Sequence, residues 1–154
     1  MNITTLSEII PQSGCSNIST IVSDVVNWSR SNLMNINWNK TKEMFIGTNA
    51  ANVISNALCV NDNVIERVYS FKLLGVVIEH NLKWNAHVDL ICTKASIRLH
   101  FLKVLKRSSL SREDLLYFYS SVIRRVLEYA CPAWHTSLTK QQTRQIESIQ
   151  KRAF

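Results

Sequence analysis

The stretch Ser111–Ala130, S-R-E-D-L-L-Y-F-Y-S-S-V-I-R-R-V-L-E-Y-A, carries the clearest helical pattern in this chain of 154 residues. Apolar residues recur every three or four positions, which places them on one face of a helix. Ser111 followed by Asp114 is typical of an N-terminal cap, and Pro132 predicts the end of the helix. The expected core face comprises Leu115, Leu116, Tyr119, Val122, Ile123, Val126, Leu127 and Ala130.

Helices are also predicted on both sides of this stretch. Residues 87–107 form the first, although Lys94 and Arg98 fall inside its apolar arc, where they either snorkel or face a charged partner. The other begins near Thr139 and is still running at Phe154, which we interpret as the sign of a truncated gene product. The core face expected for residues 87–107 comprises Leu90, Ile91, Ile97, Phe101, Leu102, Val104 and Leu105.

The front of the chain is less regular. All fourteen asparagines lie at or before Asn85, so turn-forming residues concentrate there. Residues 17–33 predict an amphipathic helix, and residues 57–78 predict short strands, of which Leu73–Ile78 is the clearest. We therefore expect a mostly helical α+β fold. The apolar face of the front helix comprises Ile18, Ile21, Val22, Val25, Val26, Trp28 and Leu33.

Charge divides the chain into two halves. Residues 1–70 carry four basic and five acidic groups, a net charge of −1, whereas residues 71–154 carry fourteen basic and six acidic groups, a net charge of +8. A basic half is typical of a protein that binds a polyanion, most often nucleic acid. The open alternative is a solvated helical surface that is rich in lysine.

Composition excludes several other classes of protein. The three glycines are isolated, so no glycine-rich phosphate loop or dinucleotide fingerprint is present. The four cysteines form no C-x-x-C pair, which argues against a zinc ribbon or a disulfide framework. The sequence has neither an apolar leader nor an 18-residue apolar span. We expect an intracellular protein, in cytoplasm or nucleus, with no membrane partner; its oligomeric state stays undetermined.

Few residues are spaced for catalysis. His87 and Asp89 have the H-x-D spacing of an iron site that would need His100 or His135 as a third ligand. Both lie at the start of a predicted helix, however, where residues two apart point in different directions. The sequence thus disfavours the iron site.

Two smaller pairs have simpler explanations. Glu113 and Asp114 fall in the first turn of a predicted helix, where negative side chains stabilise the positive end of the helix dipole and cap the helix. Cys131 and His135 are four residues apart, but Pro132 interrupts any helix between them. A catalytic thiol–imidazole pair is therefore disfavoured.

Five segments in order resemble the reverse transcriptase of non-LTR, LINE-like retrotransposons. The first begins with W-S-R at residues 28–30 and Asn32 and continues over Asn37–Met44; the others are Phe71–Val76, Leu82–His87, Tyr119–Trp134 and Ile146–Ala153. This resemblance implies a partial polymerase palm over residues 1–80 and a helical thumb over residues 81–154. The chain would then be a remnant of an RNA-directed DNA polymerase, with a non-enzymatic protein-interaction fragment as the alternative.

The resemblance also implies that catalysis is lost. Asn2 and Ile3 occupy the family's two aspartate positions, so we expect no metal and no cofactor in this chain, although the family uses Mg²⁺. Lys40 occupies the position of the family's proton donor. A strand that contacts the primer would comprise Phe71, Lys72, Leu74 and Gly75. Non-specific contacts to a nucleic-acid backbone would come from Lys103, Lys106, Arg107, Arg124, Arg125, Lys151 and Arg152.

A second resemblance covers residues 71–115. This stretch is similar to an N-terminal segment of vertebrate AlkB-type tRNA-modifying enzymes. We expect neither oxygenase nor methyltransferase activity, because the sequence offers neither an iron triad nor a glycine loop for a methyl donor.

Overall fold

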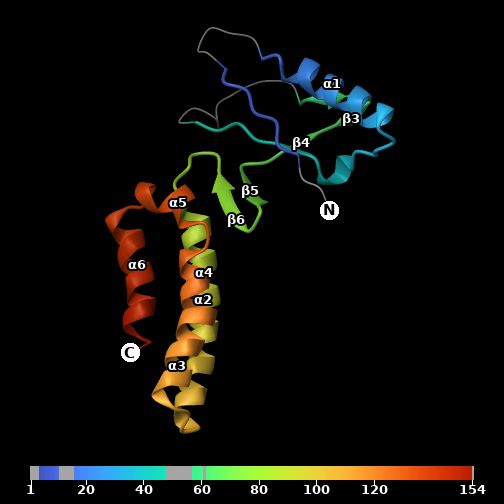
Figure 1. Ribbon diagram of the computed structural model, residues 1–154. Coiled ribbons are helices and arrows are strands. Elements are labelled where there is room, and N and C mark those ends of the chain that lie inside the picture. The colour runs from blue at the N-terminus through green and yellow to red at the C-terminus, as the bar shows by residue number, and fades with distance from the viewer. Residues whose placement is uncertain (1–3, 11–15, 48–56, 61, 154) are drawn as a thin grey trace. The chain divides into compact units, whose positions relative to one another are not determined.

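The computed structural model describes residues 4–10, 16–47, 57–60 and 62–153 (Figure 1). The chain divides into two compact units, one of Met1–Phe45 and Asn49–Tyr69, the other of Ile46–Thr48 and Ser70–Phe154. Helices and short strands occur together, so the predicted α+β class is confirmed. We call these the front unit and the helical unit and describe each by itself.

The front unit contains one helix and paired strands that are each only two residues long. Its buried core comprises Val26, Val60 and Ile65. Trp28 and Leu33, expected on the apolar face of the helix, are instead 57% and 95% exposed, because strands this short offer little surface to cover. Its elements are α1 (Ile18–Ser31), η1 (Trp38–Lys40), β1 (Lys42–Glu43) parallel to β4 (Glu66–Arg67), and β2 (Cys59–Val60) antiparallel to β3 (Asn63–Val64).

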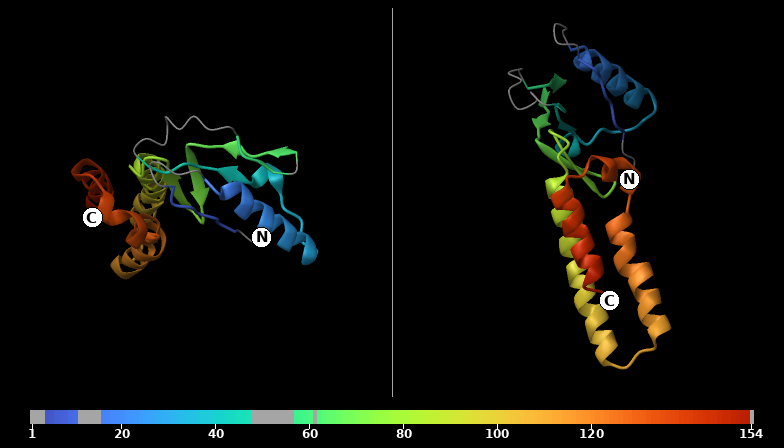
Figure 2. Two further views of the ribbon diagram at one scale, coloured as in Figure 1. Left: turned by 90° about the horizontal axis from the view of Figure 1, so that it is seen from above. Right: turned by 90° about the vertical axis from the view of Figure 1, so that its left-hand side faces the viewer.

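The helical unit is built around one long helix, α2 (Figure 2). The segment that follows it, from α3 to α4, runs back along α2, and α6 packs on α2 from another side. Its elements are the hairpin β5 (Ser70–Leu73) and β6 (Val76–Glu79), α2 (Asn85–Arg107), α3 (Arg112–Phe118), the π-helical turn η3 (Tyr119–Arg124), α4 (Arg125–Glu128), α5 (Cys131–Trp134), η4 (His135–Ser137) and α6 (Lys140–Lys151).

The predicted core face of α2 is confirmed only in part: Ile91 and Leu102 are buried, but the buried face is turned around the helix from the predicted one. Ile97, Phe101 and Val104, predicted to be core, are 56%, 55% and 43% exposed. The α3–α4 segment and α6 pack on the face that carries Val88, Ala95 and Leu99, and the apolar periodicity alone did not locate the centre of that face. The buried residues of α2 are His87, Val88, Ile91, Cys92, Ala95, Leu99 and Leu102.

A hydrogen bond explains why Arg98, one of the two cations in the predicted apolar arc of α2, is half-buried. Its Nη1 donates a 2.7 Å hydrogen bond to the carbonyl oxygen of Val122, in the π-helical turn η3. A π-helical turn shifts the backbone hydrogen-bonding pattern, and Arg98 supplies a donor to one of its carbonyl groups. Lys94, the other cation in that arc, is exposed.

Two helices begin where predicted, and the structure shows a side-chain cap at each start. Ser111 Oγ accepts the backbone N–H of Asp114 at 3.1 Å, and Thr139 forms a capping box with Gln142 at the start of α6. The prediction that Pro132 ends the preceding helix is wrong. That helix ends at Glu128, because Tyr129 leaves the helical conformation with ψ of 126°; Ala130 follows with a left-handed φ of 52°, and Pro132 lies in the first turn of α5.

The run Leu73–Ile78 is not the single strand that we predicted. Leu74 and Gly75 have φ of 46° and 93° and form the turn between β5 and β6. The Tyr129 hydroxyl donates a 2.8 Å hydrogen bond to the Leu74 carbonyl oxygen. A Cβ atom on Gly75 would lie 3.2 Å from Cε1 of Tyr129, so the ring and the positive φ both favour glycine there.

Candidate nucleic-acid interface

The last two turns of α2 gather three of the seven predicted backbone-binding cations. Lys103, Lys106 and Arg107 are all exposed, and at about 100° per residue they span about 100° of the helix surface. None of the three forms an ion pair with another described residue. Their charges are therefore available to an outside anion.

The loop after α2 extends this basic surface. We call residues 103–112 the tip; it contains Lys103, Lys106, Arg107 and Arg112 and no acidic residue. Every residue of the tip is exposed except the half-buried Leu105. Figure 1 shows that α2 and α3 continue past the end of α6, which leaves the tip without cover from α6.

The other four predicted cations are partly neutralised or stand apart from the tip. Arg124 Nε lies 2.7 Å from Glu128 Oε1, and this contact raises the pKa of Arg124. Lys151 Nζ lies 3.6 Å from Glu147 Oε2. Arg152 Nε donates a 3.3 Å hydrogen bond to the Ser148 carbonyl oxygen, and Arg125 is exposed beside Arg124.

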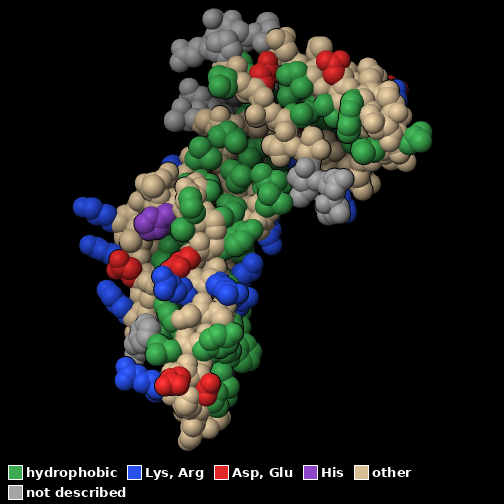
Figure 3. All heavy atoms as spheres, in the orientation of Figure 1, with side chains coloured by type: hydrophobic (Ala, Val, Ile, Leu, Met, Phe, Trp, Pro, Cys, Tyr) green, Lys and Arg blue, Asp and Glu red, His purple; other side chains and the backbone are tan. Residues whose placement is uncertain are grey.

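Two cations that sequence reasoning missed lie on α6. Lys140 and Arg144 share one face of this helix with Lys151, because positions 4 and 11 residues apart nearly coincide around a helix. Lys and Arg side chains project from the side of α6 that faces away from α2 (Figure 3). The spacing of Lys140, Arg144 and Lys151 in the sequence could have predicted this basic face.

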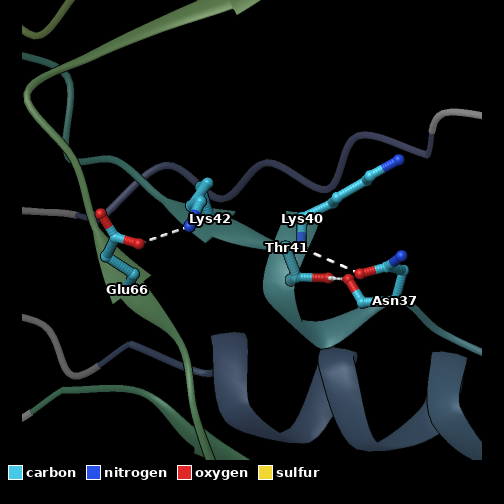
Figure 4. Close-up of polar contacts among 5 residues, drawn as sticks. All are labelled: Asn37, Lys40, Thr41, Lys42 and Glu66. Carbon is cyan, nitrogen blue, oxygen red and sulfur yellow. Dashed lines mark hydrogen bonds and ion pairs between the residues drawn. The ribbon is translucent and has the colours of Figure 1, made fainter.

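One residue tied to polymerase chemistry, Lys40, belongs to the described part of the chain. Asn2 and Ile3 lie outside the described residues. Lys40 is exposed at the end of η1, where its backbone N–H donates to Asn37 Oδ1 at 3.2 Å. Figure 4 shows its side chain extending away from the ion pair of Lys42 with Glu66.

The predicted primer-contacting residues lie in the hairpin of the helical unit. Phe71 and Lys72 belong to β5 and are exposed, and Leu74 and Gly75 form its turn. Tyr129 is the side chain that holds this turn. The close approach of the Tyr129 ring therefore explains the glycine at position 75 without a contact to a primer.

His87 is a core residue and not an iron ligand. Its ring is fully buried between Trp84 and Trp134, with centroid distances of 6.3 and 5.2 Å, whereas Asp89 is exposed and accepts a hydrogen bond from Gln145. Across the described ranges, no three His, Cys, Asp or Glu side chains gather into a metal site.

Burial also fixes the protonation state of His87. Nδ1 accepts the backbone N–H of Val77 at 3.3 Å, which places the ring proton on Nε2. Desolvation lowers the pKa of His87, and the positive charge of Lys94 lowers it further. The imidazole is therefore neutral at pH 7.

The two remaining pairs have no catalytic geometry. Glu113 and Asp114 lie in the first turn of α3, and the Asp114 carboxylate accepts the Ser111 hydroxyl at 2.7 Å. Cys131 and His135 both line a groove of about 320 Å³ between α4 and α6. Among the described residues, no hydrogen bond joins the Cys131 thiol to the His135 imidazole.

Comparison with known proteins gives one short match. The family model described as "Alkylated DNA repair protein alkB homolog 8, N-terminal" matches residues 84–124, which span α2, the tip, α3 and η3. The match covers less than half of the chain. No curated protein and no solved structure matches significantly.

This match corrects the main sequence-based assignment. The interpretation as a retrotransposon reverse transcriptase is wrong, because the matching family is an AlkB homologue's N-terminal region; the interaction-fragment alternative gains no specific support either. Tyr119, Leu127 and Trp134, which carried one of the motifs, are buried core residues, so packing alone accounts for their spacing. The second resemblance, to AlkB-type enzymes, is confirmed over residues 84–115.

No described helix has both the length and the apolar character required to cross a membrane.

Proposed function

We propose that the tip of the helical unit binds the phosphate backbone of nucleic acids without reading their sequence. One observation carries this proposal: residues 103–112 expose four cations and no carboxylate. Lys103, Lys106 and Arg107 have no ion-pair partner among the described residues that would compete with a phosphate.

Physical chemistry favours backbone contacts over base contacts at this surface. Lys and Arg that neutralise phosphates release condensed counterions, which favours binding to any sequence. Base recognition requires side chains held against groove edges, whereas the tip presents long side chains with no fixing contacts. Lys140 and Arg144 on α6 offer a second set of cations to the same kind of partner.

The family match supports this proposal over the residues that it covers. The matched residues 84–124 include the whole tip, and the name of that family refers to repair of alkylated DNA. That name concerns the family, and we take from it the class of partner alone. No oxygenase or methyltransferase chemistry is proposed for this chain.

A salt titration tests the proposal. Fluorescence anisotropy with two labelled 20-base-pair duplexes of unrelated sequence is measured between 50 and 200 mM KCl. We expect equal affinities for the two duplexes, and a log–log salt slope that the triple variant K103A/K106A/R107A reduces by about 2 to 3, since each phosphate contact contributes about 0.9.

Lys40→Ala is the matched control, because Lys40 is an exposed cation of the acidic front unit. It should leave both the affinity and the slope unchanged. An affinity that stays constant as salt rises, or a triple variant that behaves like the unchanged protein, would contradict the proposal.

A further inference from the structure

We infer that Ser109 is a phosphorylation site whose occupancy turns off the tip; the second half of this inference rests on the proposed function. The loop between α2 and α3 contains three serines, and hydrogen bonding separates them. Ser108 Oγ donates to the Val104 carbonyl oxygen at 3.2 Å. Ser111 Oγ donates to the Asp114 carboxylate and accepts the backbone N–H of Asp114. The Ser109 hydroxyl makes no hydrogen bond to any described residue.

Ser109 also occupies an accessible backbone position. It is exposed and has φ of 59°, in the left-handed region, between the end of α2 and the start of α3. Leu102 is the last buried residue of α2, and residues 103–114 contain only one half-buried side chain, Leu105. A segment with so little burial opens locally at low cost, so it can enter the cleft of a kinase in an extended form.

The flanking charges indicate the kind of kinase. Lys106 and Arg107 lie three and two residues before Ser109, and no acidic residue occurs between Leu90 and Arg112. Kinases discriminate substrates by charge pattern, and an acceptor preceded by two cations suits a cleft lined with carboxylates. Ser111 lacks this arrangement, because Ser108 and Ser109 occupy the corresponding positions.

The reaction is a phosphoryl transfer from ATP. The Ser109 Oγ forms a bond to the γ-phosphorus, the bond between that phosphorus and the β–γ bridging oxygen breaks, and ADP leaves. The hydroxyl proton passes to the catalytic carboxylate of the kinase. The product carries a charge of about −1.5 to −2 at pH 7.

That charge would oppose nucleic-acid binding at the tip. A phosphate on Ser109 lies within a few residues of Lys106, Arg107 and Arg112, and charge-assisted hydrogen bonds to it would occupy them. The net charge of the tip falls from four positive charges to about two. We expect binding at 0.1 M salt to weaken about 10- to 100-fold, because about two fewer phosphates are neutralised.

Mass spectrometry tests the modification by itself. The full chain is incubated with Mg-ATP and the catalytic subunit of cyclic-AMP-dependent protein kinase, which selects basic residues before the acceptor. We expect one phosphate, on Ser109. Ser109→Ala should abolish incorporation and K106A/R107A should slow it at least tenfold, whereas Ser108→Ala should leave it unchanged. No incorporation, or incorporation mainly at Ser108 or Ser111, would refute the site.

Anisotropy then tests the switch. Unmodified protein, phosphorylated protein and the Ser109→Ala variant treated with kinase are compared on one duplex. Weaker binding by the phosphorylated protein alone supports the switch, and equal binding by all three refutes it. If the unmodified protein binds no duplex, the proposed function fails and the switch fails with it, while mass spectrometry still decides whether Ser109 is the acceptor.

Discussion

The two ends of α2 serve different physical purposes. At its start, His87 and Val88 are fully buried and contact a core that includes Trp84 and Trp134. At its end, from Lys103 onward, the side chains are exposed and the charge is positive. One helix therefore has an end whose residues stabilise the unit and an end whose residues are free to bind a partner. Substitutions at the two ends should separate stability from binding.

Polar contacts reinforce the packed end. Trp134 Nε1 donates to the Tyr129 carbonyl oxygen at 3.0 Å. The buried Gln142 of α6 donates through Nε2 to the Lys83 carbonyl oxygen at 2.7 Å and to Asn85 Oδ1 at 2.8 Å. These contacts join α6 to the start of α2. The tip has no comparable long-range contact among its described residues.

Replacing Trp134 with alanine should have the largest effect. Its side chain is 1% exposed, so the substitution leaves a cavity and should lower the free energy of unfolding by about 3–5 kcal/mol. Urea unfolding followed by circular dichroism measures the loss. Tyr117→Ala, at a side chain that is 77% exposed, is the control and should change stability by less than about 0.5 kcal/mol. Equal losses of stability in the two variants would show that burial of Trp134 does not stabilise the core at the start of α2.

Gln142→Ala should have a smaller effect. It removes the bonds to Lys83 and Asn85 together with half of the capping box of α6, and should cost about 2 kcal/mol in the same assay. The neighbouring Gln141 is exposed, so Gln141→Ala serves as the control. If both glutamine variants unfold at the wild-type urea concentration, Gln142 does not stabilise the packed end.

The third effect depends on pH. Burial lowers the pKa of His87 below its ordinary value of 6.5, so below that pH the unfolded chain takes up a proton that the folded chain resists. The free energy of unfolding should therefore fall as pH drops below 6.5, by at most about 1.4 kcal/mol per pH unit from this group.

The variant His87→Gln isolates that contribution, because glutamine does not titrate and can still accept the Val77 N–H. It should flatten the stability curve between pH 6.5 and 5, and K103A/K106A/R107A should not. A curve of unchanged steepness in His87→Gln would show that other groups account for the acid sensitivity.

Local patterns predicted much of the helical unit. The cap at Ser111 and the start of α6 near Thr139 follow from hydrogen bonding and periodicity within a few residues. So does α1 of the front unit, predicted over residues 17–33 and observed as Ile18–Ser31. The same reasoning correctly separated His87 from Asp89, because residues two apart point in different directions on a helix. It misjudged Leu73–Ile78, where a turn with positive φ interrupts an apolar run.

The family assignment shows where motif reading reaches its limit. Aromatic and apolar residues at helical spacing satisfied a polymerase pattern, yet Tyr119, Leu127 and Trp134 form the core of the helical unit. Apolar residues at helical spacing therefore indicate core packing before they indicate membership of a family. The excess of basic residues in residues 71–154 avoids this ambiguity, since a count of charges does not depend on which apolar face is buried.

The sequence by itself determined where α1, α3 and α6 begin to within a residue or two, the cap at Ser111 and the excess of positive charge in residues 71–154. These properties depend on neighbouring residues and on composition. Only the tertiary structure decided which face of α2 is buried, that Arg98 contacts the Val122 carbonyl oxygen, and that Ser109 alone of three serines keeps a free hydroxyl among the described residues. The first two depend on which atoms distant segments bring together, and the third on the backbone conformation of the loop between α2 and α3.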